Sequence, residues 1–149
     1  MKDKFINVMK IEFEARSVNE GFARTAVAAF AAQKDPSVAV IADIKTVVSE
    51  AVTNAIVHGY AGCEDKSNCN IYIVCKMSER GRLYVSIRDK GRGIEDIETA
   101  MQPLYTTDEE GERSGMGFTI MESFTDKMKV KSKPGKGTMV ILEKRLNGR

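Results

Sequence analysis

The stretch that decides the fold runs from residue 47 to residue 60 and reads VVSEAVTNAIVHGY. Here and just upstream, apolar side chains recur at the spacing that returns to one side of an α-helix. These positions are Ile41, Ile44, Val47, Val48, Ala51, Val52 and Ala55. We therefore predict a long helix over residues 39–60 with one face in the protein core.

Three polar residues follow one edge of that apolar face. Glu50, Asn54 and His58 lie four residues apart, so they stand one above the other on the predicted helix. A carboxylate and an amide at the margin of a buried face are partly removed from water, and burial without a partner is costly. The partner is either another group of the fold or a bound ligand, metal or water. The helix alone leaves open whether Glu50 is an ordinary boundary residue or part of a site.

Length and composition bound the class of protein. The chain has 149 residues, of which 42% are hydrophobic and 30% charged, with a net charge of +2. These values are typical of one globular domain, residues 1–149, and exclude a polybasic nucleic-acid binder or a disordered tail. Neither a signal peptide nor an apolar run long enough to cross a membrane is visible, so we expect a cytoplasmic protein.

The cysteine spacing suggests neither a disulfide framework nor a zinc site. Cys63, Cys69 and Cys75 are odd in number and six residues apart, which suits neither a set of disulfides nor the paired C-x-x-C of zinc sites. We expect free thiols, two in a polar loop and one in a buried strand. A metal site formed by His58, Cys63 and Cys69 is the less favoured alternative.

The order of elements indicates the fold class. Alternating or apolar runs predict strands at residues 5–13, 70–77, 82–89, 127–132 and 138–144. Helices are predicted from residues 17–19 to just before Asp35, at 39–60 and at 116–124. Because strands and helices are largely segregated along the chain, we expect an α+β fold, a two-layer sandwich with helices on one face of a mixed, mostly antiparallel sheet.

A lysine alternation marks one of these strands. Lys127, Lys129, Lys131 and Lys133 fall on one strand face. We interpret it as a solvated face that protects a sheet edge. Nucleic-acid binding is the alternative.

Three glycine-bearing segments are the remaining motifs. They are Asp89-Lys90-Gly91-Arg92-Gly93, Gly115-Met116-Gly117 and Gly135-Lys136-Gly137-Thr138. The first two do not complete G-x-G-x-x-G, because Asp96 and Ile120 occupy the last glycine positions, and no G-x-x-x-x-G-K-[ST] is present. Rossmann and P-loop sites are therefore excluded.

The placement of these segments suggests a nucleotide. Ser114 to Gly117 lie at a predicted helix start, where free backbone N–H groups favour phosphate. Asp89 ends a strand, where its carboxylate can accept a hydrogen bond from a ligand amine. Arg113 is placed to meet a terminal phosphate. The loop of about twenty residues between these motifs, residues 94–114, has the length of a lid.

Together these motifs resemble a known superfamily. Glu50-x-x-x-Asn54, Asp89-x-Gly91-x-Gly93 and Gly115-x-Gly117 are similar to the three ATP-binding boxes of the Bergerat (GHKL) ATPase and kinase superfamily. The runs 49–60, 102–107 and 112–122 further resemble the sporulation anti-sigma F factors of endospore-forming bacteria. The agreement covers nearly the whole chain. The general-stress anti-sigma factors share the boxes but differ around the second glycine pair.

The resemblance implies a serine-protein kinase that uses Mg-ATP and binds a sigma factor. It implies that Asn54 ligates Mg²⁺, that Glu50 orients or deprotonates the substrate serine, and that Arg113 contacts the γ-phosphate. It further implies a set of residues that bind ATP or ADP: Asn54, Asp89, Gly91, Gly93, Thr107, Ser114, Gly115, Met116, Gly117 and Thr138. Within this set, Asp89 would bind the adenine amine and Thr138 would assist there. Gly91 and Gly93 would let the lid backbone approach.

The resemblance also implies partners. The expected partners are a sigma factor of the sigma F type and a STAS-domain anti-anti-sigma protein, which would be phosphorylated on serine. A homodimer is expected through the N-terminal region, where Arg24 matches the arginine that faces either partner. From the residues alone, Arg24 is an ordinary solvated side chain.

A general-stress-type anti-sigma kinase is one alternative, and two others remain open. One is a nucleotide-gated binding module that changes partner without appreciable phosphotransfer, which would need neither Glu50 nor Arg113. The other is a histidine-kinase catalytic domain, which is disfavoured because the chain has no room for a separate phosphoacceptor hairpin.

Overall fold

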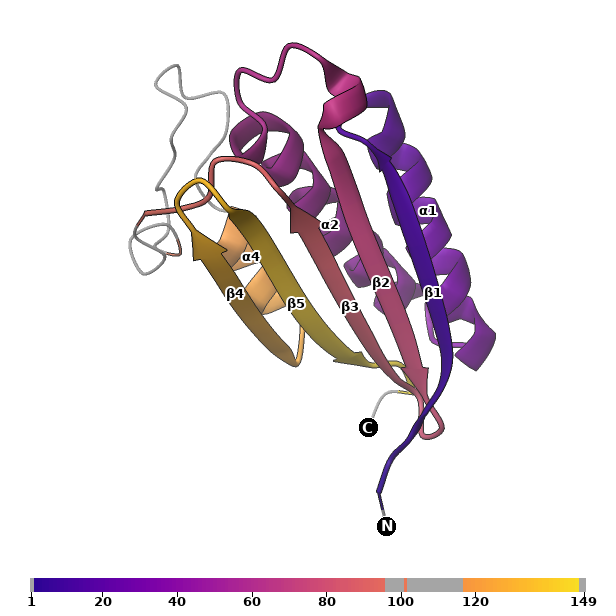
Figure 1. Cartoon of the computed structure of the whole chain (residues 1–149). Coiled ribbons are helices and arrows are strands. Elements are labelled where there is room, and N and C mark those ends of the chain that lie inside the picture. Colours follow the sequence, from indigo (N-terminus) through magenta and orange to yellow (C-terminus); the bar gives the residue numbers. More distant parts are fainter. Residues whose placement is uncertain (1, 96–100, 102–116, 148–149) are drawn as a thin grey trace.

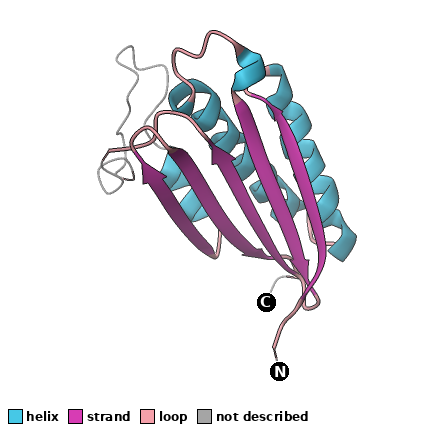
Figure 2. Ribbon diagram, in the orientation of Figure 1, coloured by secondary structure: helices cyan, strands magenta, loops and turns pink. Residues whose placement is uncertain are grey.

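The protein folds into two layers, a five-stranded sheet with the helices packed on one of its faces (Figures 1 and 2). The computed structural model describes residues 2–95, 101 and 117–147. In chain order the larger elements are β1 (Phe5–Glu14), α1 (Val18–Ala31), α2 (Val38–Asn54), β2 (Asn70–Ser78), β3 (Arg82–Asp89), α4 (Gly117–Ser123), β4 (Lys127–Lys133) and β5 (Gly137–Arg145). Three short helical segments, Ala32–Lys34, Ala55–Gly59 and Lys66–Asn68, complete the list.

The strand order is β1-β2-β3-β5-β4, and all four pairings among these strands are antiparallel. This confirms the predicted α+β sandwich with helices on one face. The sheet is antiparallel throughout the described strands. The register places Asp89, at the end of β3, opposite Thr138 near the start of β5. Two residues far apart in the sequence are thereby brought to the same end of the sheet.

The predicted central helix is confirmed through Asn54, where its geometry changes. The Ser37 hydroxyl accepts a hydrogen bond from the Val40 N–H at 3.2 Å and caps the start of α2. Residues Ala55–Gly59 then form a π-helical turn, in which the Tyr60 N–H donates to the Ala55 carbonyl at 2.9 Å. The prediction of one regular helix to Tyr60 was therefore wrong in its last turn. Single π turns often lie at functional sites.

The core lies between the helices and the sheet. Val47, Val48 and Val52 of α2 are almost fully buried, as the helical periodicity predicted. On β2 the alternate residues Ile71 and Ile73 are fully buried against them. Such alternation is what one buried sheet face requires.

The lysine-bearing strand is β4, which lies at the edge of the sheet. Its four lysines are exposed and alternate with half-buried residues. This confirms the interpretation of a solvated strand face at a sheet edge, where charge discourages pairing with another chain.

The prediction for the cysteines was wrong for two of the three. Cys63 and Cys69 form a disulfide, with their Cα atoms 6.8 Å apart. The short helical turn Lys66–Asn68 folds the loop back and brings the two residues together, which spacing alone could not indicate. Because both sulfur atoms are bonded to each other, neither is a thiolate available to a metal. Cys75 is the expected buried free thiol.

None of the described helices combines the length and the apolarity that a membrane span requires.

Candidate functional site

The first part of the site lies where α2 meets α4. Glu50 and Asn54 project from the last two turns of α2 and are half-buried. Gly117, the first residue of α4, lies directly against them. A Cβ atom on Gly117 would stand 3.1 Å from the Asn54 side-chain nitrogen and 3.3 Å from Glu50 Oε2. A side chain at this position would crowd both polar groups. Three residues of two predicted motifs therefore converge here.

The second part of the site lies at the end of β3. Asp89 is buried, with 5% of its surface exposed. Its carboxylate accepts hydrogen bonds from the Gly91 N–H, at 2.9 Å, and from the backbone N–H of Thr138. Burial raises the pKa of the Asp89 carboxyl, and these two hydrogen bonds oppose the rise. The fold therefore keeps a poorly solvated carboxyl group at this end of the sheet.

Two glycines let the π turn approach that carboxylate. A Cβ atom on Gly59 would stand 2.8 Å from Asp89 Oδ2, and one on Gly91 would collide with the Gly59 carbonyl oxygen. The same carbonyl accepts a hydrogen bond from the Arg92 N–H at 2.8 Å. The end of the long helix and the segment after β3 thus pack backbone against backbone, which joins the two parts of the site.

Tyr60 connects the π turn to the strands beside it. This residue was assigned no role from the sequence. Its buried hydroxyl accepts a hydrogen bond from the Lys90 N–H at 2.7 Å and donates to the Asn70 carbonyl at 2.5 Å. Burial raises the pKa of the Tyr60 hydroxyl, which keeps it protonated as a donor. One side chain therefore links the helix end to the start of β2 and to the residue after Asp89. The one indication in the sequence was its position two residues after His58, the last of the three polar residues spaced along the helix.

Gly93 and Thr138 lie where the chain leaves the sheet toward the predicted lid. Gly93 has a φ of +77°, and a Cβ there would collide with the Lys133 carbonyl oxygen. The Thr138 hydroxyl lies 2.8 Å from the Ser132 hydroxyl, which also accepts from the Ile94 N–H. Ser132 was not anticipated from the sequence. It holds the first residue of the predicted lid against the strands.

Several predicted site residues lie outside the described residues. These are Thr107, Arg113, Ser114, Gly115 and Met116, together with residues 96–100 and 102–114 of the predicted lid. Their assignments stay predictions.

Arg24 lies on α1. Its side chain is 44% exposed, and its Nη1 atom lies 3.5 Å from Glu20 Oε2, one helical turn earlier. That Glu20 oxygen is buried and accepts no hydrogen bond from the described residues. The ion pair holds the guanidinium on the outer surface of the helix, although such an exposed pair adds little stability.

The donor set near Asn54 is compatible with Mg²⁺. The described residues contain no cluster of three His, Cys, Asp or Glu side chains that would enclose a metal. Mg²⁺ does not require one, since it commonly binds to one or two protein oxygens together with phosphates and water. The Asn54 amide oxygen beside the Glu50 carboxylate, in a gap that a Cβ on Gly117 would fill, suits that pattern.

Comparison with known proteins identifies the family. The family model of the histidine kinase-like ATPase domain matches residues 11–144. The chain is 51% identical to the anti-sigma F factor of Thermoanaerobacter sp. (strain X514), over 141 residues that cover 95% of each protein. It is 55% identical to that of Halalkalibacterium halodurans over 140 residues, 94% of this chain and 93% of the relative. The chain belongs to the anti-sigma F factor family. This confirms the resemblance that its motifs predicted.

Solved structures support the fold of this anti-sigma F family member. The RsbU and RsbW domains of Rv1364c from Mycobacterium tuberculosis match with a TM-score of 0.69 and 22% identity, over 95% of this chain and 33% of that one. The catalytic domain of histidine kinase ThkA matches with a TM-score of 0.57 and 19% identity, over 93% and 97% of the two chains. At these identities the likeness shows the histidine kinase-like fold alone.

Proposed function

We propose that the chain is a serine-protein kinase and sigma-factor antagonist. It would use Mg-ATP to phosphorylate a serine of a STAS-domain anti-anti-sigma protein, and it would bind a sigma factor of the sigma F type. The observation that carries the proposal is the convergence of Glu50 and Asn54 on Gly117, joined through Gly59 to the buried carboxylate of Asp89. Membership of the anti-sigma F factor family supports the sigma factor as a partner, and the STAS-domain partner rests on the proposal.

Asp89 would recognise the base. A buried carboxylate is an acceptor, and the exocyclic amine of adenine is a donor, whereas guanine presents a carbonyl oxygen at that position. The Gly91 and Thr138 N–H groups hold the carboxylate in one orientation. The residue therefore favours adenine over guanine nucleotides.

Asn54 and Glu50 would act at the phosphate end. Asn54 would hold Mg²⁺ through its amide oxygen, and the ion would supply neutralisation of phosphate charge. Glu50 would accept the proton of the serine hydroxyl as that oxygen bonds to the γ-phosphorus and the bond to the leaving ADP breaks. Phosphoryl transfer depends mainly on positioning and charge, so a half-buried metal ligand and a half-buried base on one helix suit the reaction.

The remaining nucleotide contacts rest on the motif match. Arg113 would stabilise the charge that develops on the transferred phosphoryl group. Ser114, Gly115, Met116 and Gly117 would line the phosphates, and Thr107 would contribute from the lid. These residues, Gly117 apart, lie outside the described part of the chain.

Arg24 would contribute to partner binding. Arg24 is exposed on α1, and its guanidinium group lies beside the Glu20 carboxylate. A homodimer through the N-terminal region would bring two such helices into one assembly. Because a sigma factor acts on cytoplasmic RNA polymerase, we place the protein in the cytoplasm.

The deciding experiment is intact-mass spectrometry of a sporulation-type anti-anti-sigma protein after incubation with this chain and Mg-ATP. A gain of one phosphoryl group on a serine, absent with Glu50→Gln, would support both the kinase activity and the role of Glu50. Calorimetry with Mg-ATP on both proteins is the control, because Glu50→Gln should retain nucleotide binding. Nucleotide binding without transfer by the unaltered chain would instead favour the nucleotide-gated binding module.

A further inference from the structure

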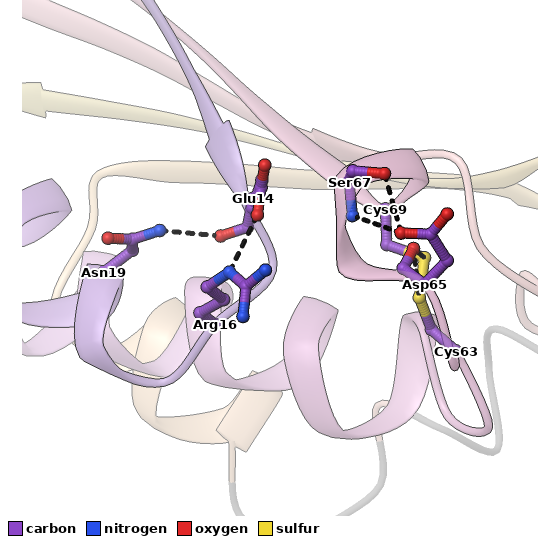
Figure 3. A network of polar contacts seen from close by, with 7 residues as sticks. All are labelled: Glu14, Arg16, Asn19, Cys63, Asp65, Ser67 and Cys69. Carbon is purple, nitrogen blue, oxygen red and sulfur yellow. Dashed lines mark hydrogen bonds and ion pairs between the residues drawn. A yellow bond between two sulfur atoms is a disulfide. The ribbon is translucent and has the colours of Figure 1, made fainter.

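A disulfide lies in the loop between the π turn and β2, and the proposed reaction does not use it. It joins Cys63, three residues after Tyr60, to Cys69, directly before the first residue of β2 (Figure 3). In the reducing interior of most cells such bonds are transient or regulatory rather than structural.

We propose that Cys63 and Cys69 form a reversible redox site. Its substrates are dithiol reductants and small disulfide oxidants of the glutathione type. The oxidised form stabilises the hydrogen bonds of Tyr60 close to Asp89, in the part of the proposed nucleotide site that would bind adenine. This second part rests on the proposed function, whereas the redox chemistry itself does not.

The loop accommodates both redox states. Cys63 is half-buried and Cys69 is only 9% exposed, so Cys63 is the more open of the two residues to an attacking thiolate. The Asp65 carbonyl oxygen lies 3.4 Å from the sulfur of Cys63 and 3.5 Å from that of Cys69. After reduction, the same oxygen is within reach of either S–H group.

Contacts within the loop keep the two sulfurs close together after reduction. Asp65 Oδ1 accepts hydrogen bonds from the Ser67 N–H at 3.1 Å and from the Ser67 hydroxyl at 2.6 Å. The Cys69 N–H donates to the Lys66 carbonyl at 3.0 Å. None of these bonds depends on the disulfide, so the effective concentration of one thiol at the other remains high and re-oxidation is favoured.

The Cys69 end of the loop is anchored. The Cys69 carbonyl accepts a hydrogen bond from the Ala15 N–H at 2.7 Å. The residues beside Ala15 are themselves tied, since Arg16 pairs with the Glu14 carboxylate at 2.7 Å and Asn19 donates to the Glu14 carbonyl at 3.0 Å (Figure 3). Movement on reduction therefore falls on the Cys63 side.

The Cys63 side leads to the nucleotide site. The Cys63 N–H donates to the Tyr60 carbonyl at 3.0 Å. The Tyr60 hydroxyl bridges from there to the Asn70 carbonyl and to the N–H of Lys90, the residue after Asp89. The loop between Tyr60 and Asn70 is thus closed by two cross-links, the disulfide and the hydrogen bond from the Tyr60 hydroxyl. Opening the disulfide leaves the tyrosine as the remaining cross-link and loosens its hold on the strand end that carries Asp89.

The chemistry balances as ordinary thiol–disulfide exchange. A thiolate of the dithiol attacks the Cys63 sulfur, and Cys69 leaves as a thiolate that takes up a proton. The second thiol of the reductant then attacks the mixed disulfide, and Cys63 leaves and is protonated in turn. The protein gains two electrons and two protons, and the dithiol becomes a disulfide. Oxidised glutathione drives the reverse change: the Cys63 thiolate attacks one glutathione sulfur and releases one reduced glutathione. The Cys69 thiolate then attacks the Cys63 sulfur of that mixed disulfide and releases the second.

Cys75 provides an internal control. It is fully buried on β2, and burial raises the pKa of its thiol to about 12. Since the thiolate is the reactive species, Cys75 should not exchange while the protein is folded.

The test uses the full chain equilibrated with defined ratios of reduced and oxidised glutathione. After acid quenching, cysteines are alkylated in denaturant and counted by intact mass. With three cysteines in all, the oxidised protein should carry one alkyl group and the reduced protein three. Reduction should also lower the melting temperature by about 5 °C, because it releases a short closed loop.

The same samples are titrated with Mg-ATP in a calorimeter. The dissociation constant should rise about three- to tenfold on reduction, as expected when a hydrogen bond at the site is weakened. Cys63→Ser/Cys69→Ser should match the reduced protein under both conditions, and Cys75→Ser should respond as the unaltered chain does. In Tyr60→Phe, which lacks the bridging hydroxyl, ATP affinity should no longer depend on redox state.

Three alkyl groups at every glutathione ratio would overturn the redox site. A disulfide that forms without changing ATP affinity, or a redox effect that persists in Tyr60→Phe, would overturn its connection to the nucleotide site. If neither state binds ATP, the proposed function fails, while the alkyl count and the melting temperature still decide the redox site.

Discussion

Gly59 lies directly on the carboxylate of Asp89: a Cβ atom at position 59 would stand 2.8 Å from Asp89 Oδ2 and 2.9 Å from Oδ1. Gly59 ends the π turn that follows α2, and Asp89 ends β3. Because no side chain separates them, the helix fixes the position of the carboxylate. The position of the carboxylate proposed to bind adenine therefore depends on a glycine that belongs to none of the three predicted ATP-binding boxes.

Gly59→Ala should displace Asp89 and weaken ATP binding by at least about tenfold. Overpacking of this kind typically costs about 1–3 kcal/mol of stability. Calorimetry and thermal unfolding measure the two effects. Gly21→Ala is the matched control, because its Cβ would meet the nearest heavy atom at 3.8 Å and the residue is helical. The control should bind ATP normally and be at least as stable as the unaltered chain. Equal ATP affinity in the two variants would contradict the packing argument.

Gly117→Ala should damage phosphotransfer more than nucleotide binding. The added methyl group would stand within 3.5 Å of both Asn54 and Glu50, so the proposed metal ligand and the proposed general base would have to shift slightly, by a few tenths of an ångström. A misplacement of about 1 Å can cost about 10²-fold in rate. Single-turnover transfer to the anti-anti-sigma protein gives the rate, and ADP titration without Mg²⁺ gives the binding. Equal losses in both measurements would mean that the residue acts only on binding.

Asp89→Asn should abolish adenine recognition and stabilise the nucleotide-free protein at neutral pH. Burial raises the pKa of the Asp89 carboxyl above its ordinary value of 3.8. A group with a raised folded-state pKa contributes stability at low pH and loses it as the pH rises through that pKa. The ionised carboxylate is therefore a cost at pH 7, which asparagine removes.

The measurement for Asp89→Asn is the melting temperature of both proteins from pH 3.5 to pH 8. The advantage of the variant should be small at the acid end and grow as the pH rises. A constant difference, or one that shrinks toward neutral pH, would show that the hydrogen bonds from Gly91 and Thr138 outweigh desolvation.

Arg24→Glu should weaken binding to both protein partners and leave ATP affinity unchanged. The substitution places a second carboxylate beside Glu20, which now lies 3.5 Å from the guanidinium. Pull-downs with a sigma F-type factor and with the anti-anti-sigma protein test the first part, and calorimetry tests the second. Lys45→Glu, at an exposed position of α2, has the same change of charge and serves as control. Loss of binding in both variants would indicate a general effect of charge.

The sequence by itself determined the elements and suggested which residues form the candidate site. The 3.6-residue spacing of Ile44, Val47 and Val48 is a local property, and it located α2 together with its buried face. The alternation on β2 did the same for the strand. The spacing of Glu50 and Asn54, and the glycines after Asp89, indicated a nucleotide before any contact was known.

Only the tertiary structure decided which of these groups meet. The π turn, the contact of Gly117 with Asn54 and the bridge made by Tyr60 each join residues that periodicity cannot relate. The disulfide depends on how one loop folds back on itself, which a spacing of six residues leaves undetermined. Local patterns report which side of an element is buried, whereas long-range contacts depend on how all the elements pack at once. Many residues of the candidate site could therefore be proposed from the sequence, whereas their arrangement in space could not.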